Sequence, residues 1–219
     1  AGNTLALVSI FLFAAGFPAA EVLLDVWHPI TLMFVRLLMA VSTLVVVWAF
    51  IEGLSSVLKA PWLKGIKIGL LGFGLGTNLL LFAQWFTDPI TVALLATLIP
   101  VSATILEVWD GRRKLNSKFI LGLIASIIGG FIAVSENISV DLGWGVLMAL
   151  GSGFCFMWAS DKSVTSLPEL SSIARSSVTF TGAAVFTTIS FAVFFTLGLI
   201  EIPNRLSSGQ FLSLIIYSV

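Results

Sequence analysis

Long apolar runs, separated by short polar segments, dominate the pattern of this chain. A helix that crosses a membrane needs about 20 apolar residues, and most of the runs reach that length. The pattern therefore predicts a series of membrane-spanning helices, and it lacks the polar–apolar alternation of half-buried strands. The predicted spans cover residues 4–26, 29–50, 62–86, 89–108, 117–135, 142–159 and 168–199.

Prolines mark the ends and the bends of these runs. Pro29, Pro89 and Pro168 are predicted in first turns, where a missing N–H costs nothing. Pro18 and Pro100 fall within runs and are expected to kink their helices. The last run, 209–219, begins like a span but is long enough for only half a bilayer, so we expect the natural chain to continue beyond it.

Composition points to the same class of protein. Of 219 residues, 58% are hydrophobic and 10% are charged, whereas a soluble domain carries about 25% charged residues. A chain this apolar cannot cover its surface with polar groups in water. Its composition therefore excludes a typical soluble enzyme. The eleven basic and eleven acidic residues balance, which argues against a nucleic-acid partner, since that needs a basic face. We predict an all-α polytopic membrane protein.

Few residues are available for catalytic or metal chemistry. Cys155 is the one cysteine and His28 the one histidine. A disulfide within the chain is therefore excluded, and a zinc site lacks its nitrogen and sulfur donors. A Ser-His-Asp triad would have to use His28, which lies at the end of a predicted span with no nucleophile placed beside it. We predict no enzyme activity, no metal and no cofactor.

Basic residues indicate how the spans are oriented. Most of the eleven lie in the connections after the second, fourth and sixth spans, and acidic residues prevail in the other connections. Because short cytoplasmic loops are rich in Lys and Arg, we expect the N-terminus and the loop 112–118 in the cytoplasm. The basic set is Lys59, Lys64, Lys67, Arg112, Arg113, Lys114, Lys118 and Lys162; the opposite loops hold Asp25, Asp88, Glu136, Asp141 and Glu201, with Arg205 as the exception.

The two halves of the chain share a spaced Pro–Arg pair. Arg36 follows Pro29 by seven residues, and Arg175 follows Pro168 by seven. The same offset pairs Phe17 with Phe156 and Ala20 with Ala159. An odd number of spans between the copies inverts the second copy, and inverted repeats are typical of transporters that bind solute near the midplane. A chance match in an apolar sequence is the alternative. Each arginine is either a structural anchor or a solute contact.

Polar and aromatic side chains on the spans are the candidates for a binding site. Asn78, Phe82 and Trp85 share one helix face, and an amide deep in a span needs a partner or water. One polar anchor beside aromatic rings suits a small, partly apolar solute; a hydrogen bond from Asn78 to another helix is the alternative. The other candidates share a face on their own helices, and packing or lipid contact is the alternative for them: Phe13 and Phe17, Thr91 and Leu95 with Leu98, and Phe154 and Trp158.

Glycines recur along the third span at Gly69, Gly72, Gly74 and Gly76. Small residues four apart let two helices approach closely. We expect these glycines to serve helix packing.

Four stretches together resemble the drug/metabolite transporter superfamily, and in particular its ten-helix EamA-like branch. They are FAAGFPAAE (13–21), HPITLMFVRLLMA (28–40), LLLFAQWFTDPITVALLATLIP (79–100) and LGLIASIIGGFIAV (121–134). The chain departs from the family pattern at Phe13 (tryptophan in the family), Glu21 (lysine), Gln84 (leucine) and Arg113 (an acidic residue).

The resemblance implies ten helices arranged as two inverted five-helix repeats, the second incomplete in this chain. The first repeat would cover 1–138, and the second would cover 139–219. Helices 1, 3, 4, 6, 8 and 9 of the family surround a central cavity. In this chain the resemblance and the candidate residues together predict a substrate site formed by Phe13, Phe17, Asn78, Phe82, Thr91, Leu95, Phe154 and Trp158.

The resemblance also implies a function. We expect a secondary transporter in a bacterial inner membrane that moves small organic metabolites by alternating access, exporting amino acids, including aromatic or other bulky ones. Its partners would be the lipid bilayer, the solute and protons; proton coupling, exchange and uniport remain open, because the acidic residues lie near predicted span ends. The alternative is an integral membrane protein that does not transport, either an intramembrane enzyme or an assembly subunit.

Overall fold

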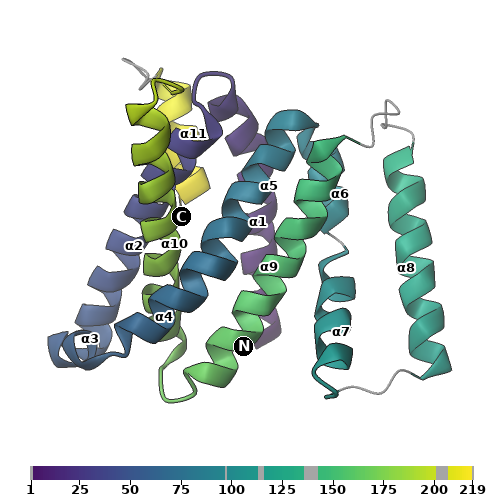
Figure 1. Cartoon of the computed structure of the whole chain (residues 1–219), viewed down its shortest axis with the longest axis horizontal. Helices are drawn as coiled ribbons and strands as arrows, with labels where there is room; N and C mark the ends of the chain where they lie inside the picture. Colours follow the sequence, from purple (N-terminus) through teal and green to yellow (C-terminus); the bar gives the residue numbers. More distant parts are fainter. Residues whose placement is uncertain (1, 97, 113–115, 136–142, 201–206, 219) are drawn as a thin grey trace.

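The protein is a bundle of helices that run up and down beside one another (Figure 1). The computed structural model describes residues 2–96, 98–112, 116–135, 143–200 and 207–218. All the regular structure within these ranges is helical. The elements are α1 Gly2–Leu24, α2 Pro29–Glu52, α3 Leu54–Lys59, α4 Trp62–Ile68, η1 Gly69–Gly74, α5 Leu75–Phe86, α6 Pro89–Ala96, α7 Ile99–Trp109, α8 Ser117–Ser135, α9 Trp144–Ser166, α10 Ser172–Thr196 and α11 Ser208–Ser218.

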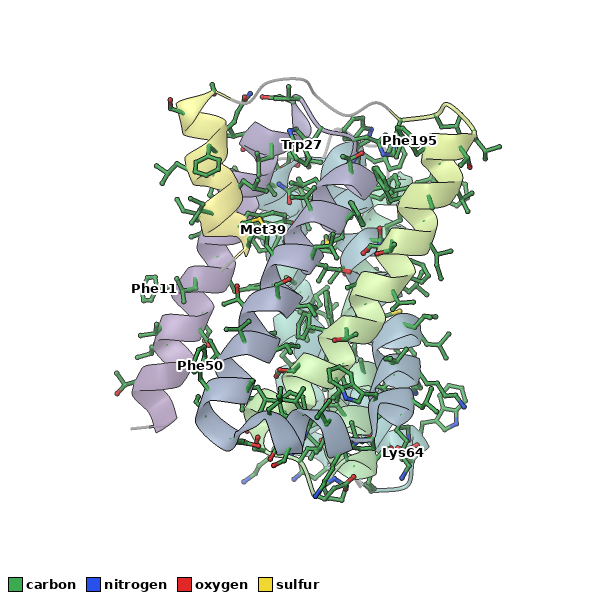
Figure 2. All side chains as sticks on the ribbon, turned by 90° about the vertical axis from the view of Figure 1, so that its left-hand side faces the viewer. Phe11, Trp27, Met39, Phe50, Lys64 and Phe195 are labelled. Atoms are coloured by element: carbon green, nitrogen blue, oxygen red, sulfur yellow. The ribbon has the colours of Figure 1, made fainter. Side chains whose placement is uncertain are left out.

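Five stretches are long and apolar enough to cross a membrane: Leu7–Leu24, Pro29–Glu52, Trp62–Phe86, Pro89–Trp109 and Ser172–Thr196. Much of their surface faces outward, and Figure 2 shows Phe11 and Phe50 projecting away from the bundle with 75% and 85% of their surface exposed. Exposed apolar side chains on such helices are solvated by lipid. The prediction of an all-α polytopic membrane protein is confirmed.

Two predicted spans are not among these five. The described apolar part of α8, Ser117–Gly129, is shorter than a span. The helix α9 is 23 residues long, but its last turns contain Ser160, Asp161 and Lys162, which lower its hydropathy. These polar turns also carry α9 beyond the predicted end at residue 159, as far as Ser166.

The structure corrects the position of Pro168. This residue was predicted in the first turn of a helix beginning at 168, but α10 begins at Ser172, and Pro168 lies in the preceding turn. Ser171 caps the helix instead, because its Oγ accepts the N–H of Ala174 at 3.2 Å. Arg175 is therefore the fourth residue of α10, whereas Arg36 is the eighth of α2. The shared spacing places the two arginines at different helical positions, and the inverted repeat remains a prediction.

The other prolines lie close to where the pattern put them. Pro29 begins α2 and Pro89 begins α6, while Pro18 lies inside α1. Pro100 divides the run 89–108 into two helices, since α7 starts at Ile99 with Pro100 in its first turn. A proline removes a backbone donor and clashes with the preceding turn, so the chain breaks here and restarts.

Glycines in α4, η1 and α5 bring this segment against α9 and α10. A Cβ at Gly69 would lie 1.7 Å from the carbonyl oxygen of Thr179, and one at Gly182 would lie 2.3 Å from that of Ile66. On the other face, a Cβ at Gly72 would meet that of Ala159 at 2.3 Å. Backbone contacts this close are the usual way in which membrane helices associate. The packing role expected for the glycines is confirmed.

Charge separates the two ends of the bundle. Apart from Arg36, which lies within α2, the basic residues that the structure describes lie in or near the turns at the lower end of the bundle, where Figure 2 labels Lys64, opposite Trp27 and Phe195. Asp25 and Asp88 lie in turns at the upper end. Arg113, Lys114, Glu136, Asp141, Glu201 and Arg205, which entered the orientation argument, lie outside the described residues.

Candidate functional site

A cavity of about 410 Å³ lies between α1, α2, α5, α10 and α11. Aromatic rings form much of its wall: Phe13 and Phe17 from α1, Phe180 from α10 and Tyr217 from α11. Its polar side-chain groups are few and come from Ser9, Arg36, Gln84 and the hydroxyl of Tyr217. An apolar, aromatic wall with a small number of placed polar groups is the usual composition of a small-molecule site. We call this space the central cavity.

Arg36 supplies the positive charge of the central cavity. Its guanidinium carbon lies 4.0 Å from the centre of the Tyr217 ring, which is a cation–π contact. Within the part of the chain that the structure describes, no carboxylate pairs with Arg36. An arginine within a span is costly, by about 2.5–3.5 kcal/mol at a helix centre, and a ring face compensates only part of that cost. The charge is therefore available to an anionic group in the cavity.

Gln84 forms the opposite polar wall. Its Nε2 donates to the main-chain carbonyl of Phe17 at 2.8 Å, and the side chain is buried. This hydrogen bond joins α5 to α1 beside Pro18, where the proline interrupts the helical hydrogen bonding of α1. The rings of Phe13 and Phe17 meet edge to face, with centroids 5.3 Å apart. The bond and the ring contact together fix the α1 wall of the cavity.

Two further cavities share a lining residue with the central one and lie towards opposite ends of the bundle. Towards the lower end, Phe180 also lines a pocket of about 270 Å³ between η1, α9 and α10. Towards the upper end, Gln84 also lines a pocket of about 310 Å³ that contains Glu21, Asp25 and Asp88. We call these the lower pocket and the upper pocket. Each of them shares one lining residue with the central cavity.

Phe180, the residue that the lower pocket shares with the central cavity, belongs to a pair of stacked rings, which we call the lower barrier. Phe73 from η1 and Phe180 from α10 have centroids 5.0 Å apart and planes inclined by 13°. The close glycine contacts between η1 and α10 hold the two rings at this distance. The segment η1 is π-helical, and such segments are frequent at functional sites. Its position at this barrier therefore favours a functional role for the ring pair.

The EamA-like transporter family model matches residues 1–135, more than half of the chain. The chain belongs to the EamA-like transporter family. Comparison with curated proteins and with solved structures gives no significant match. Membership in this family, with the apolar spans, indicates an integral membrane protein that transports small solutes.

In this EamA-like chain, the predicted site residues are found in several places. Phe13 and Phe17 line the central cavity. Asn78 is buried and bonded within its own helix, since its Nδ2 donates to the carbonyl of Gly74 at 2.8 Å. Phe82 lies between the rings of His28 and Phe86, at centroid distances of 5.9 and 6.3 Å.

The remaining four also lie apart from the central cavity. Thr91 is buried in the first turn of α6, where its N–H donates to Asp88 Oδ1 at 2.8 Å. Leu95 packs against the core cluster around Phe17 and Ala83. Phe154 and Trp158 line a separate pocket of about 280 Å³ beside the ends of α7 and α9. The structure therefore brings only two of the eight residues into one cavity.

Most residues that line the central cavity were not among the predicted site residues, and Gln84, Phe180 and Tyr217 are three of these. Gln84 could have been chosen from the sequence, because it is a polar residue within an apolar run. Tyr217 is the one tyrosine of the chain, but its contact with Arg36 joins elements far apart in sequence. Phe180 is one of 18 phenylalanines and carries no signal of its own.

Two smaller sets of contacts close the ends of the bundle. At the lower end, Arg112 donates to both carboxylate oxygens of Asp161, at 2.7 and 2.9 Å, and to Asp110 at 2.6 Å. The hydrogen bonds with Asp161 and then Asp110 raise the pKa of the Arg112 guanidinium above its ordinary value. This ion cluster ties the end of α7 to α9.

At the upper end, His28 caps α2. Its Nδ1 accepts the N–H of Ile30 at 3.3 Å, and its ring lies among those of Phe82, Trp85 and Phe194, at 5.6–6.0 Å between centroids. Burial among these rings lowers the pKa of the imidazole below its ordinary value. The neutral imidazole, whose Nδ1 has a lone pair to accept the Ile30 N–H, is therefore the form that caps α2.

Proposed function

We propose that this EamA-like protein is a secondary transporter that exports amino acids, including aromatic and other bulky ones, by alternating access. The observation that carries the proposal is the central cavity, together with the two pockets that share Phe180 and Gln84 with it towards the two ends of the bundle. In the central cavity, Arg36 would receive the carboxylate of the solute. The Gln84 Oε1 would accept a hydrogen bond from the ammonium group of the solute. The side chain of the solute would pack against the aromatic rings of the cavity, which are those of Phe13, Phe17, Phe180 and Tyr217.

The charge of the three spaces fits the passage of such a solute. The lower pocket holds Arg175 and several hydroxyl groups, whereas the upper pocket holds three carboxylates. A zwitterion meets complementary charge in each space, and a sugar phosphate would meet repulsion in the upper one. We propose that the lower, basic end faces the cytoplasm of a bacterial cell and that the N-terminus lies there, as the excess of Lys and Arg indicates.

Alternating access requires that the two barriers open in turn. The Phe73–Phe180 stack would open towards the cytoplasm, and the Gln84–Phe17 bond would open towards the outside. Pro18 lies beside the second barrier, and its interrupted helix is a natural point of bending. The predicted inverted repeat would provide the symmetry for this exchange. Of the predicted site residues, Phe13 and Phe17 would contact the solute; the role of the other six stays a prediction.

Flux through proteoliposomes tests the proposal. Vesicles containing the protein and loaded with labelled phenylalanine or leucine should lose the label faster than empty vesicles. Replacing Arg36 by Gln should raise the KM by roughly tenfold to a hundredfold, since a hydrogen bond to a charged group is worth about 1.5–3 kcal/mol. Arg112→Gln is the matched control, because Arg112 lies outside the central cavity, and its KM should not change.

The outcomes separate the alternatives. Flux that follows an imposed pH gradient would add proton coupling, and flux that ignores the gradient would support uniport or exchange. If neither amino acid crosses faster than in empty vesicles, amino-acid export is excluded. If Arg36→Gln leaves the KM unchanged, the central cavity is not the binding site.

A further inference from the structure

The lower pocket has the composition of an anion site. It lies where the last turns of α9 and the first turns of α10 meet η1, and it measures about 270 Å³. Its α10 wall is one continuous helical stripe at spacings of three and four: Ser172, Arg175, Ser176 and Thr179. Its α9 wall presents Ser160 and Ser163 on one face. The stacked rings of Phe73 and Phe180 also line it, and Phe180 is shared with the central cavity.

Arg175 brings a positive charge that its surroundings do not balance. Its Nη2 donates to the carbonyl of Leu170 at 2.9 Å, which fixes the guanidinium against the turn before α10. Its Nε is buried and has no hydrogen-bond partner. Among the described residues, no carboxylate lies within ion-pair distance of it. A charge of this kind is costly near a membrane unless something anionic compensates it.

Free hydroxyl groups surround this charge. Ser163 and Thr179 donate to carbonyls of their own helices. In the part of the chain that the structure describes, the hydroxyls of Ser160, Ser172 and Ser176 donate to no protein group, and all three line the pocket. A guanidinium with several free hydroxyl donors is a set that binds an oxyanion. The N-terminal end of α10 adds a favourable partial charge.

We propose that the lower pocket binds the carboxylate of the solute at Arg175, before the solute passes the Phe73–Phe180 stack into the central cavity. This rests on the proposed function for its place in transport, although binding itself does not require flux. The solute would enter with its carboxylate towards Arg175 and its apolar part against the two rings. The lower pocket is thus a first site, and Arg36 belongs to a second.

A cysteine at position 176 reports on this pocket alone. In a Cys155→Ala background, which removes the native thiol, Ser176→Cys should react faster with an anionic methanethiosulfonate than with a cationic one. The ratio of the two rates should fall by roughly tenfold in Arg175→Gln, because local charge steers the reagent. Arg175→Lys should restore most of the ratio, and Arg36→Gln should leave it unchanged. Gel filtration checks that each variant is folded.

Protection of the cysteine from labelling shows which chemical group the lower pocket binds. Sodium benzoate should slow the labelling of Ser176→Cys, and benzamide, which has the same ring without the charge, should not. Equal protection by both compounds would overturn the carboxylate site, and so would a rate ratio that Arg175→Gln leaves unchanged. Protection by benzoate in a protein that moves no amino acid through proteoliposomes would keep this site and reject the proposed function.

Discussion

Arg36 and Arg175 show how single charged residues are accommodated in an apolar chain. Neither pairs with a carboxylate among the described residues; Arg36 lies over the Tyr217 ring, and Arg175 donates to the Leu170 carbonyl. Both leave guanidinium donors facing a cavity. A residue kept only as an anchor would gain more from a carboxylate partner or from snorkelling to water. Their surroundings therefore favour contact with a ligand over a purely structural role.

His28 makes the stability of the upper end depend on pH. Its pKa is lowered in the fold, so the unfolded chain takes up a proton first, at pH near 6.5. Stability from this residue is thus present above pH 6.5 and is lost as the pH falls towards the lower folded pKa. Protonation also removes the lone pair that accepts the Ile30 N–H. Because the ring is partly exposed, solvent screens the charge and the effect on stability should be small.

Thermal unfolding of the purified protein in detergent at pH 8 and at pH 5.5 measures the contribution of His28 to the pH dependence of stability. The midpoint should be lower at pH 5.5, by a few degrees at most. His28→Asn keeps a capping acceptor but does not titrate in this range, so it should show a smaller difference between the two pH values. An unchanged difference in His28→Asn would assign the pH dependence to other groups.

At the scale of elements, the α4–η1–α5 segment decides how closely the helices approach. Gly69→Ala would place a methyl group on the Thr179 carbonyl and force α10 away. We expect a loss of about 1–3 kcal/mol of stability, as for other overpacked sites, seen as a lower unfolding midpoint. Gly129→Ala is the control, because a Cβ there meets nothing within 4 Å and alanine favours a helix. Equal midpoints for the two variants would contradict the close packing at Gly69.

The elements themselves were largely predictable, and their arrangement was not. Hydropathy and prolines located α2 and α8 closely, because the bilayer sets the length of an apolar run, but the single span predicted over 89–108 is divided into α6 and α7. The start of α10 was missed, since the Ser171 cap competed with Pro168 and prevailed. The π-helical η1 has no simple sequence pattern, because its hydrogen bonding depends on packing against α9 and α10.

The candidate site was only partly predictable for a related reason. A pattern along one helix gives a face, and so Phe13 and Phe17 could be chosen together. It does not say which helices are neighbours or how each one is rotated. Asn78 was chosen as a buried amide, but its carbonyl partner is Gly74 of its own helical segment. The Arg36–Tyr217 contact depends on α2 meeting α11, which no spacing within either helix reveals.

For the molecule as a whole, the two barriers make a prediction about access. Leu80 lines the central cavity, so Leu80→Cys in a Cys155→Ala background should react slowly with a water-borne thiol reagent. Phe180→Ala removes one ring of the lower barrier and should speed this labelling several-fold. Phe195→Ala is the control, because Phe195 is exposed at the upper end (Figure 2). Fast labelling with both rings in place would show that the stack is no barrier.

The π-helical turn at η1, directly before α5, contains one residue more than an α-helical turn would hold. If Gly69–Gly74 returned to ordinary α-helical geometry, the surplus position would pass along the chain and turn α5 by about 100° about its own axis. Gln84 would then swing off the Phe17 carbonyl, while Phe73 would leave its partner ring. The glycines that permit tight contact present no side chain to resist such a screw motion, so a single slip would release both closed gates, and closing one of them again requires a second movement.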